Sequence, residues 1–276
     1  MNEAIAEHGA LFRVDGETIV PTELSRGPWY PGTLHGGPPA ALLAWALERH
    51  DPGPASFVAR LTVDLLRPVP LAPLQLEVRT SRPGQKVQWL EGALLADGVE
   101  VARASALRLR PAEGEVEAHE DDSVKVPPPP ETVAPIAFGL GRDVGYWTAN
   151  DLRPIGGAFG VPGPGAAWFR LLCPVVAGEE TTPLQRVAAA ADFGSGVGHP
   201  VSTESGGAIN PDVTVTVHRD LMGEWVWLDS RGWAHDGGVG MVESIVCDRS
   251  GAVGRAVQTL LLRPFTGPPV WTTAEP

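Results

Sequence analysis

The sequence predicts an α+β fold of two similar halves, each with one buried helix followed by a meander of antiparallel strands. Two apolar helical segments stand out, HGGPPAALLAWALERH at 35–50 and LQRVAAAAD at 184–192. Each precedes leucine-rich or β-branched runs separated by Pro, Gly or Asp-Gly turns, a pattern typical of antiparallel strands. The halves also repeat each other: VARASALRLRP at 101–111 matches GRAVQTLLLRP at 254–264, and RLTVDLLRP at 60–68 matches DVTVTVHRD at 212–220. The two offsets, 153 and 152 residues, are nearly equal and indicate a duplicated domain.

Length and composition agree with two domains. The chain has 276 residues and a mass of 29.1 kDa, the size of about two ordinary domains. Apolar residues make up 43% of the chain, which is enough for a sizeable core. The 33 glycines and 28 prolines imply many turns and exclude a long helical bundle.

The first half begins with a predicted hairpin. LFRVDGETIV at 11–20 turns at Asp15-Gly16, and residues 27–32 form a loop before the helix. Pro38 and Pro39 suit the first helical turn, where a missing N–H costs nothing. Every residue from Ala40 to Leu47 is apolar, so we expect a helix that is buried on most faces. Four strands are predicted after it, at 55–68, 74–82, 86–98 and 99–111.

The composition changes between the halves. Residues 111–135 are acidic and contain a run of four prolines, which is typical of a linker. Residues 136–165 are rich in Gly and Pro and are expected to be irregular, packed by Tyr146, Trp147 and Phe159. Strands of the second half are predicted at 168–172, 212–220, 223–232, 240–251 and 252–264. We therefore expect an N-terminal domain at 1–112, an acidic, Pro-rich and irregular connection at 113–150, and a C-terminal domain at 151–276.

The charge balance and the cysteines exclude several classes of protein. There are 33 acidic and 21 basic residues, a net charge of −12, so no basic stripe for nucleic acid is expected. Cys173 and Cys247 have apolar neighbours and are expected to be small buried hydrophobic residues, not a disulfide scaffold. No basic and apolar leader and no run of 18 apolar residues occurs, which predicts a cytoplasmic protein without a membrane partner. The histidines have no metal-ligand spacing, and we expect neither a metal nor a cofactor.

Residues in both halves resemble one known family. They are Gly32-Thr33-Leu34-His35-Gly36-Gly37 at the first helix, the two Leu-Leu-Arg-Pro segments, Ala191-Asp192 and Ala256-Val257-Gln258. This set resembles the type II, or TesB-like, acyl-CoA thioesterases, whose fold is the double hotdog, two tandem domains each with a long helix wrapped by an antiparallel sheet. The resemblance omits only the linker and residues 136–165. It implies an enzyme of fatty acid metabolism that hydrolyses an acyl-CoA to free acid and CoA, and it implies a homodimer.

The family's hydrolytic water is held and activated by three polar groups. They are an Asp on the helix, a Thr on a strand and a Gln on the last strand, and the matching positions here are Asp192, Asn210 and Gln258. Asn210 departs from the family's Thr, although an amide also hydrogen-bonds water. Burial at the end of an apolar helix is expected to raise the pKa of Asp192 and make it a better base.

Each of these residues also has a purely structural interpretation. Asp192 precedes Phe193-Gly194-Ser195-Gly196 and is equally suited to cap the helix or make a turn. Gln258 faces either a site water or, by alternation, the solvent. Asn210 precedes Pro211, and Asn-Pro commonly starts a turn.

The start of the first helix is the candidate site for the thioester oxygen. Gly36 and Gly37 allow close approach to the backbone, and the N–H groups of a helix N-terminus attract developing negative charge. His35 is placed to orient substrate; a tight turn and a packed histidine are the structural alternatives. No G-x-S-x-G motif occurs, so a covalent nucleophile is not expected.

Two other functions remain open on this sequence. A hydratase or dehydratase of the same fold acts on enoyl-CoA through a His with a nearby Asp, and only His35 is placed for that role. The other is a non-catalytic acyl-CoA-binding protein.

The first half retains the glycine pair without the carboxylate, and the second half retains the carboxylate without the glycine pair. Nine residues after His35, where single-domain relatives place the carboxylate, stands Ala44, and nine before Asp192 stands Pro183 without a glycine pair. We therefore expect one competent site per chain, and apolar side chains at the pseudo-equivalent position.

Overall fold

A computed structural model describes residues 3–51, 56–111, 123–136, 144–156, 159, 161–202 and 206–264. The first half contains α1 (Glu3–His8), β1 (Phe12–Asp15), β2 (Thr18–Pro21), the short η1 (Glu23–Ser25), α2 (Gly37–Arg49), β3 (Phe57–Leu65), β4 (Leu74–Arg82), β5 (Val87–Ala96) and β6 (Val99–Leu109). The second half contains η2 (Pro130–Thr132), η3 (Tyr146–Ala149), β7 (Asn150–Ile155), β8 (Gly165–Leu171), α3 (Pro183–Ala191), α4 (Gly194–Val197), β9 (Gly207–Ile209), β10 (Asp212–Val217), β11 (Val226–His235), β12 (Val239–Asp248) and β13 (Gly251–Arg263).

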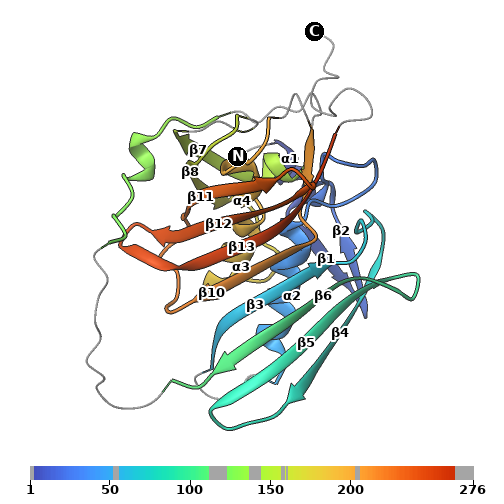
Figure 1. The fold of residues 1–276 in the computed structure, drawn as a ribbon. Helices are drawn as coiled ribbons and strands as arrows, with labels where there is room; N and C mark the ends of the chain where they lie inside the picture. The colour runs from blue at the N-terminus through green and yellow to red at the C-terminus, as the bar shows by residue number, and fades with distance from the viewer. Residues whose placement is uncertain are drawn as a thin grey trace.

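The strands form one continuous antiparallel sheet that crosses both halves. Its order is β1-β2-β4-β5-β6-β3-β10-β13-β12-β11-β8-β7, and β9 adds to β13. The halves join where β3 pairs with β10, which lie side by side in Figure 1. At this seam Thr62 and Thr214 are partners, their hydroxyl oxygens 3.1 Å apart and their positions 152 residues apart. Because 152 is also the offset of the sequence repeat, a pseudo-two-fold axis runs between these two threonines.

The two long helices pack against each other on the inner side of the sheet (Figure 1). Most of α2 is buried, including every residue from Gly37 to Ala44, because strands of the first half cover one side and α3 covers another. Pro38 and Pro39 lie in its first turn, as predicted. One core cluster includes residues of both helices and both halves of the sheet.

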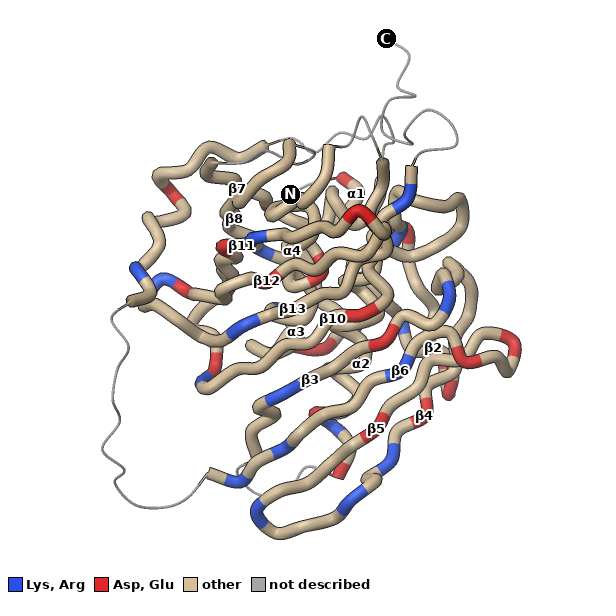
Figure 2. Tube along the Cα trace, viewed as in Figure 1, with Lys and Arg blue, Asp and Glu red and all other residues tan. Residues whose placement is uncertain are grey.

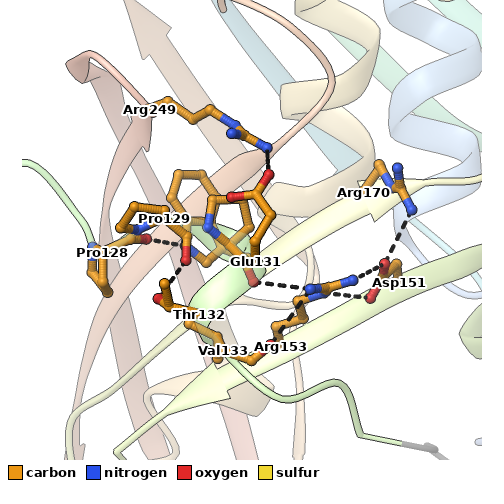
Figure 3. A network of polar contacts seen from close by, with 11 residues as sticks. Pro128, Pro129, Glu131, Thr132, Val133, Asp151, Arg153, Arg170 and Arg249 are labelled. Atoms are coloured by element: carbon orange, nitrogen blue, oxygen red, sulfur yellow. Dashed lines mark hydrogen bonds and ion pairs between the residues drawn. The ribbon is translucent and has the colours of Figure 1, made fainter.

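The end of the connection lies on the outer face of the C-terminal half as a proline-rich strap, residues 128–133 (Figure 3). Trp168 Nε1 donates to the Pro128 carbonyl oxygen at 2.8 Å, and Arg153 donates to that of Pro130 at 2.9 Å. Glu131 pairs with Arg249. Val133 packs in an outer cluster with Trp168 and other aromatic residues. This strap therefore covers the tryptophan cluster with ordered chain.

Most predicted elements are confirmed, including both long helices, the first hairpin and the strands of both meanders. The irregular assignment of 136–165 is wrong over 150–155, where β7 forms. This strand pairs only with β8 at the edge of the sheet, where the missing N–H of Pro154 is tolerated, and that proline concealed the strand in the sequence. Residues 112–122, the acidic part of the predicted connection, lie outside the described residues, and the domain boundaries stay a prediction.

Cys173 and Cys247 are free and buried, as predicted. Burial raises the pKa of the Cys173 thiol to about 12 and, with the nearby Asp248, that of Cys247 to about 11. No helix in the described part of the chain is long and apolar enough to cross a membrane. Acidic and basic residues are interspersed over both halves of the described trace in Figure 2.

Candidate active site

The N-terminus of α2 meets the C-terminus of α3, and there a histidine pairs with a buried aspartate. Asp192 is the C-cap residue of α3 and is only 5% exposed. Its Oδ2 lies 2.7 Å from Nδ1 of His35, which stands just before α2. The backbone of His35 is itself fixed, because its N–H donates to the Ser25 carbonyl oxygen at 3.0 Å. The pair therefore joins the two halves of the chain.

Asn210 and the glycine pair complete the surroundings of this carboxylate. Asn210, in the segment before β10, donates from Nδ2 to Asp192 Oδ1 at 2.5 Å. The backbone N–H of Gly37 points at this pair: it donates to His35 Nδ1 at 3.3 Å and also interacts with the carboxylate. A Cβ atom on Gly36 would lie 2.7 Å from Asp192 Oδ1, so only glycine allows this approach.

These contacts reverse the expected change in the acidity of Asp192. Burial acts to raise its pKa, as expected, but the His35 charge and the hydrogen bonds from His35, Asn210 and Gly37 outweigh burial. The pKa of Asp192 is therefore lowered, and the prediction of a raised value is wrong. The carboxylate stays ionised over a wide pH range and is a weaker base than a raised pKa would make it.

Gln258 lies on the inner face of β13 and is 1% exposed, which excludes the solvent-facing interpretation. Its Oε1 accepts the Ser195 backbone N–H at 2.9 Å, and its Nε2 donates to the Asp192 backbone oxygen at 3.2 Å. The amide thus holds the junction between α3 and α4, so its contact with Asp192 is through the backbone.

Tyr146 is a site neighbour whose role the sequence did not indicate. It is fully buried, stacks on Phe193 with ring centroids 5.3 Å apart, and lies 4.9 Å from the His35 ring. Its hydroxyl donates to the Ala189 carbonyl oxygen in α3 at 2.8 Å. Burial and the Asp192 charge raise the pKa of Tyr146 well above its ordinary value, so the phenol stays protonated. A lone tyrosine in an irregular stretch carries no sequence signal for this position.

All six residues predicted for the site are thus brought together around one carboxylate. His35, Asn210 and Gly37 contact the Asp192 side chain, Gly36 faces it, and Gln258 binds its backbone. Because Pro38 and Pro39 have no N–H, Gly36 and Gly37 supply the first donors of α2. A carboxylate, an imidazole, amides and a helix N-terminus in one buried place suit activation of water beside a polarised carbonyl. No cluster able to hold a metal occurs among the described residues.

The position nine residues after His35 is apolar, as predicted, because Ala44 is fully buried, but the nearby end of the helix pair carries polar side chains. Glu48, near the end of α2, accepts hydrogen bonds from Thr182 Oγ1 at 2.7 Å and Gln185 Nε2 at 3.0 Å. Arg108 from β6 is 2% exposed and donates to the Leu47 and His50 carbonyl oxygens at the end of α2. The sequence signal was available, because Glu48 is the only acidic residue of α2, whose residues from Gly37 to Leu47 are all uncharged.

Two family models match the chain, one for each half. Residues 25–109 match the N-terminal domain of acyl-CoA thioesterases, and residues 120–262 match the C-terminal domain. The chain belongs to the acyl-CoA thioesterase family. It is accordingly a thioester hydrolase, and acyl-CoA is the substrate class of the family.

Solved structures agree with the double hotdog fold of this acyl-CoA thioesterase family member. A hot dog fold protein of unknown function from Alicyclobacillus acidocaldarius has a TM-score of 0.73 at 16% identity, covering 94% of this chain and 98% of its own. The acyl-CoA thioesterase II TesB2 of Mycobacterium marinum has a TM-score of 0.67 at 18% identity, covering 96% and 98%. The tesB protein of Mycobacterium avium subspecies paratuberculosis has a TM-score of 0.66 at 16% identity, covering 95% and 99%. No curated protein shows significant sequence similarity to the chain.

Proposed function

We propose that the protein hydrolyses acyl-CoA to free acid and CoA by attack of a water that Asp192 activates. The observation that carries this proposal is the buried Asp192 carboxylate, 2.7 Å from His35 and 2.5 Å from Asn210, at the N-terminus of α2. Family membership supports the reaction class, and the geometry supports the assignment of residues.

Asp192 takes the proton of the attacking water. Each carboxylate oxygen keeps a lone pair after accepting from Asn210 or His35, and the lowered pKa keeps the group ionised. Asn210 orients the carboxylate, and Gln258 fixes the backbone that carries it. The N–H of Gly36, the N-cap residue, and the positive end of the α2 dipole stabilise the oxyanion that forms on the thioester carbonyl, while the N–H of Gly37 holds the Asp192 carboxylate. Hydrolysis breaks the C–S bond, and CoA leaves as the thiol.

Thiol release from a series of acyl-CoA esters tests the reaction, and its pH profile tests the base. With Asp192 as direct base, kcat/KM should stay flat from neutral pH down to the acid limit of folding, because the pKa of Asp192 is lowered. A loss of rate near the range where histidine titrates would instead make the other ring nitrogen of His35 the base, with Asp192 orienting it.

The pairing of His35 with Asp192 also favours a second candidate, hydration of an enoyl-CoA. A His with a neighbouring carboxylate is suited to adding water across a double bond by general acid–base chemistry. Incubation with a trans-2-enoyl-CoA separates the two. A hydroxyacyl-CoA product without thiol supports hydration, and thiol without a hydroxyacyl-CoA supports hydrolysis.

A homodimer is part of the proposal and has a candidate surface. On the outer face of β11 to β13, Trp233, Val239, Met241 and Leu261 are 51%, 58%, 41% and 38% exposed and occupy neighbouring cross-strand rows. Exposed apolar patches of this kind commonly mark association sites. Arg231 and Glu243 are register partners beside the patch, and Glu243 forms an ion pair with Arg255, so charges of both signs border the patch. Light scattering should give twice the mass of one chain for the wild type, and the mass of a single chain for Trp233→Lys.

A cytoplasmic location and a place in fatty acid metabolism complete the proposal, because that is where acyl-CoA substrates of this class are found. Cell fractionation of the tagged protein, together with measurement of acyl-CoA pools after its deletion, tests both.

A further inference from the structure

A cavity of about 480 Å³ lies at the end of the helix pair opposite Asp192. Its walls come from the end of α2, the start of β3, the end of β6, the N-terminus of α3 and the segment after β10. Its lining includes the polar side chains of Glu48, Arg108 and Thr182 and the apolar ones of Leu184, Val187 and Leu221. This volume and mixture of surfaces are those of a small-molecule site.

The cavity is the pseudo-symmetric counterpart of the active site. The offset of 152 residues that relates Thr62 to Thr214 also relates their partners, Ser105 to Val257. Adding 152 to 58 gives 210, so Val58 in the cavity wall corresponds to Asn210. Adding 152 to 106 gives 258, so Gln258 corresponds to buried Ala106, and Arg108 is the next inward residue of β6.

The carboxyl group at this end is also displaced relative to Asp192. Ala44 stands where the base is expected, and Glu48 lies about one helical turn further along α2. The same elements therefore surround both places, but the side chains at the second end are different.

Arg108 is the side chain at the cavity that most needs a partner. Its NH1 and NH2 groups donate to the carbonyl oxygens of Leu47, His50 and Asp51. Its Nε is buried without a hydrogen-bond partner, and it forms no ion pair, among the described residues. A buried guanidinium with a free N–H and no contacting carboxylate is suited to a ligand anion.

The other charged groups at the cavity are compatible with an anion there. Arg219 is neutralised by Asp248, to which it donates two hydrogen bonds, and Asp220 is exposed to solvent. Burial and the nearby Asp220 raise the pKa of Glu48, against the hydrogen bonds of Thr182 and Gln185 and the charge of Arg108. Glu48 thus takes up a proton more readily than an ordinary glutamate, and in its protonated form the carboxyl group can donate to an anion.

We propose that this cavity is a second ligand site that binds a monocarboxylate with an aliphatic chain. The carboxylate is recognised by the guanidinium of Arg108, a residue that lines the cavity, with Glu48 beside it, and the chain lies against Leu184, Val187 and Leu221. Free acids released by thioester hydrolysis belong to this class, but the argument for binding stands on the cavity and does not depend on the reaction at Asp192.

The test is photolabelling with a decanoic acid that carries a diazirine in its chain, followed by peptide mapping. We expect label on peptides that contain 56–58, 182–187 or 217–221, and its loss when unlabelled decanoate is added. A decyl alcohol probe of the same length should label these peptides at least tenfold less, because it cannot satisfy the guanidinium as an anion does.

Substitutions at two serines test whether the label is bound in the cavity. Ser56 is exposed at the cavity, and Ser56→Trp or Ser56→Phe should obstruct it and reduce labelling at least tenfold. Ser81→Trp is a matched change at an exposed residue of β4 that does not line the cavity, and it should leave the labelling unchanged. Acyl-CoA thiol release should be unchanged in all three, because neither serine belongs to the active site.

Three results would overturn the proposal: label confined to peptides around His35 or Asp192, equal labelling by the alcohol, or undiminished labelling in both folded Ser56 variants. Absence of thiol release in the wild type would defeat the proposed hydrolysis and leave the labelling result intact, so the two failures are distinguishable.

Discussion

At the scale of single residues, the charges and hydrogen-bond donors around Asp192 determine its ionisation more than its burial does. A carboxyl group buried alone is driven towards its neutral form. Here His35, Asn210 and the Gly37 N–H supply compensating interactions, and the ionised form is favoured instead. The same chain carries the opposite case at Glu48, where burial prevails. The number and charge of the contacts distinguish the two carboxyl groups.

Asp192→Asn tests the base directly. The amide has the same shape but cannot take a proton, so we expect turnover of acyl-CoA to fall by a factor of about 100 or more while the fold persists. Thiol release and the thermal melting curve are the two measurements. Wild-type turnover in a folded variant would remove Asp192 from the mechanism.

Gln258→Ala should have a smaller effect on turnover, about tenfold, because the amide positions Asp192 and does not react. It should also lower the free energy of unfolding by about 1–3 kcal/mol, since the Ser195 N–H and the Asp192 oxygen lose a buried partner. Denaturant unfolding measures the stability change. A rate loss as severe as that of Asp192→Asn would show a direct role in the reaction.

Asp248→Asn should make the free energy of unfolding less sensitive to acidic pH. Asp248 is fully buried, and its pKa is lowered by hydrogen bonds from Arg219, Ser250 and Met222 N–H, against the effect of burial. A lowered pKa contributes stability above the unfolded pKa of about 4, and that contribution is lost as pH falls towards the folded pKa. We expect a loss of about 2 kcal/mol at pH 7, because Arg219 is partly exposed. The difference between variant and wild type should shrink below about pH 4 in urea unfolding.

At the scale of elements, the site depends on how closely α2 approaches the end of α3. The absence of side chains at Gly36 and Gly37 permits that approach, because a Cβ on Gly37 would lie 2.6 Å from the Ala189 carbonyl oxygen of α3. The strap over the tryptophan cluster is also held by contacts between elements. Backbone oxygens of its proline run accept hydrogen bonds from the side chains of Trp168 and Arg153 (Figure 3).

Gly36→Ala should separate these two helix ends. Its Cβ would meet both Asp192 oxygens below 3.0 Å, so the carboxylate or the helix must move by several tenths of an ångström. We expect a fall in kcat of about tenfold or more, since small misplacements of catalytic groups are costly. Equal kcat in Gly36→Ala and wild type would contradict the proposed geometry.

At the scale of the whole molecule, duplication has produced two unlike ends on one helix pair. The seam at Thr62 and Thr214 keeps the symmetry of the backbone, while the side chains around Asp192 and Glu48 have diverged. One end has glycines at the start of its helix; the other has Thr182 and Pro183. Only the first places the start of a helix without side chains beside a carboxylate.

A non-hydrolysable acyl-CoA should therefore bind with one equivalent per chain in calorimetry. The end at Glu48 recognises a free carboxylate, which a thioether analogue of acyl-CoA lacks, so it should not add a second equivalent. Glu48→Gln, which preserves the shape at that end, should leave the stoichiometry at one. Two equivalents in the wild type would mean that both ends accept the thioester.

The sequence by itself determined the duplication, both buried helices and the strand meanders. These follow from local periodicity and from an internal repeat, each of which is written along the chain. The six candidate site residues came from the resemblance to a known family, and their roles stay a prediction. The edge strand β7 could not be found in this way, because Pro154 is tolerated there only through its place at the edge of the sheet.

Only the tertiary structure decided the acidity of Asp192 and the character of the second end. The His35–Asp192 contact spans 157 positions (192 − 35), and the Thr182–Glu48 contact spans 134. Whether a buried carboxyl group is ionised depends on the charges and donors within a few ångströms of it, and residues this far apart are brought to that distance only by folding.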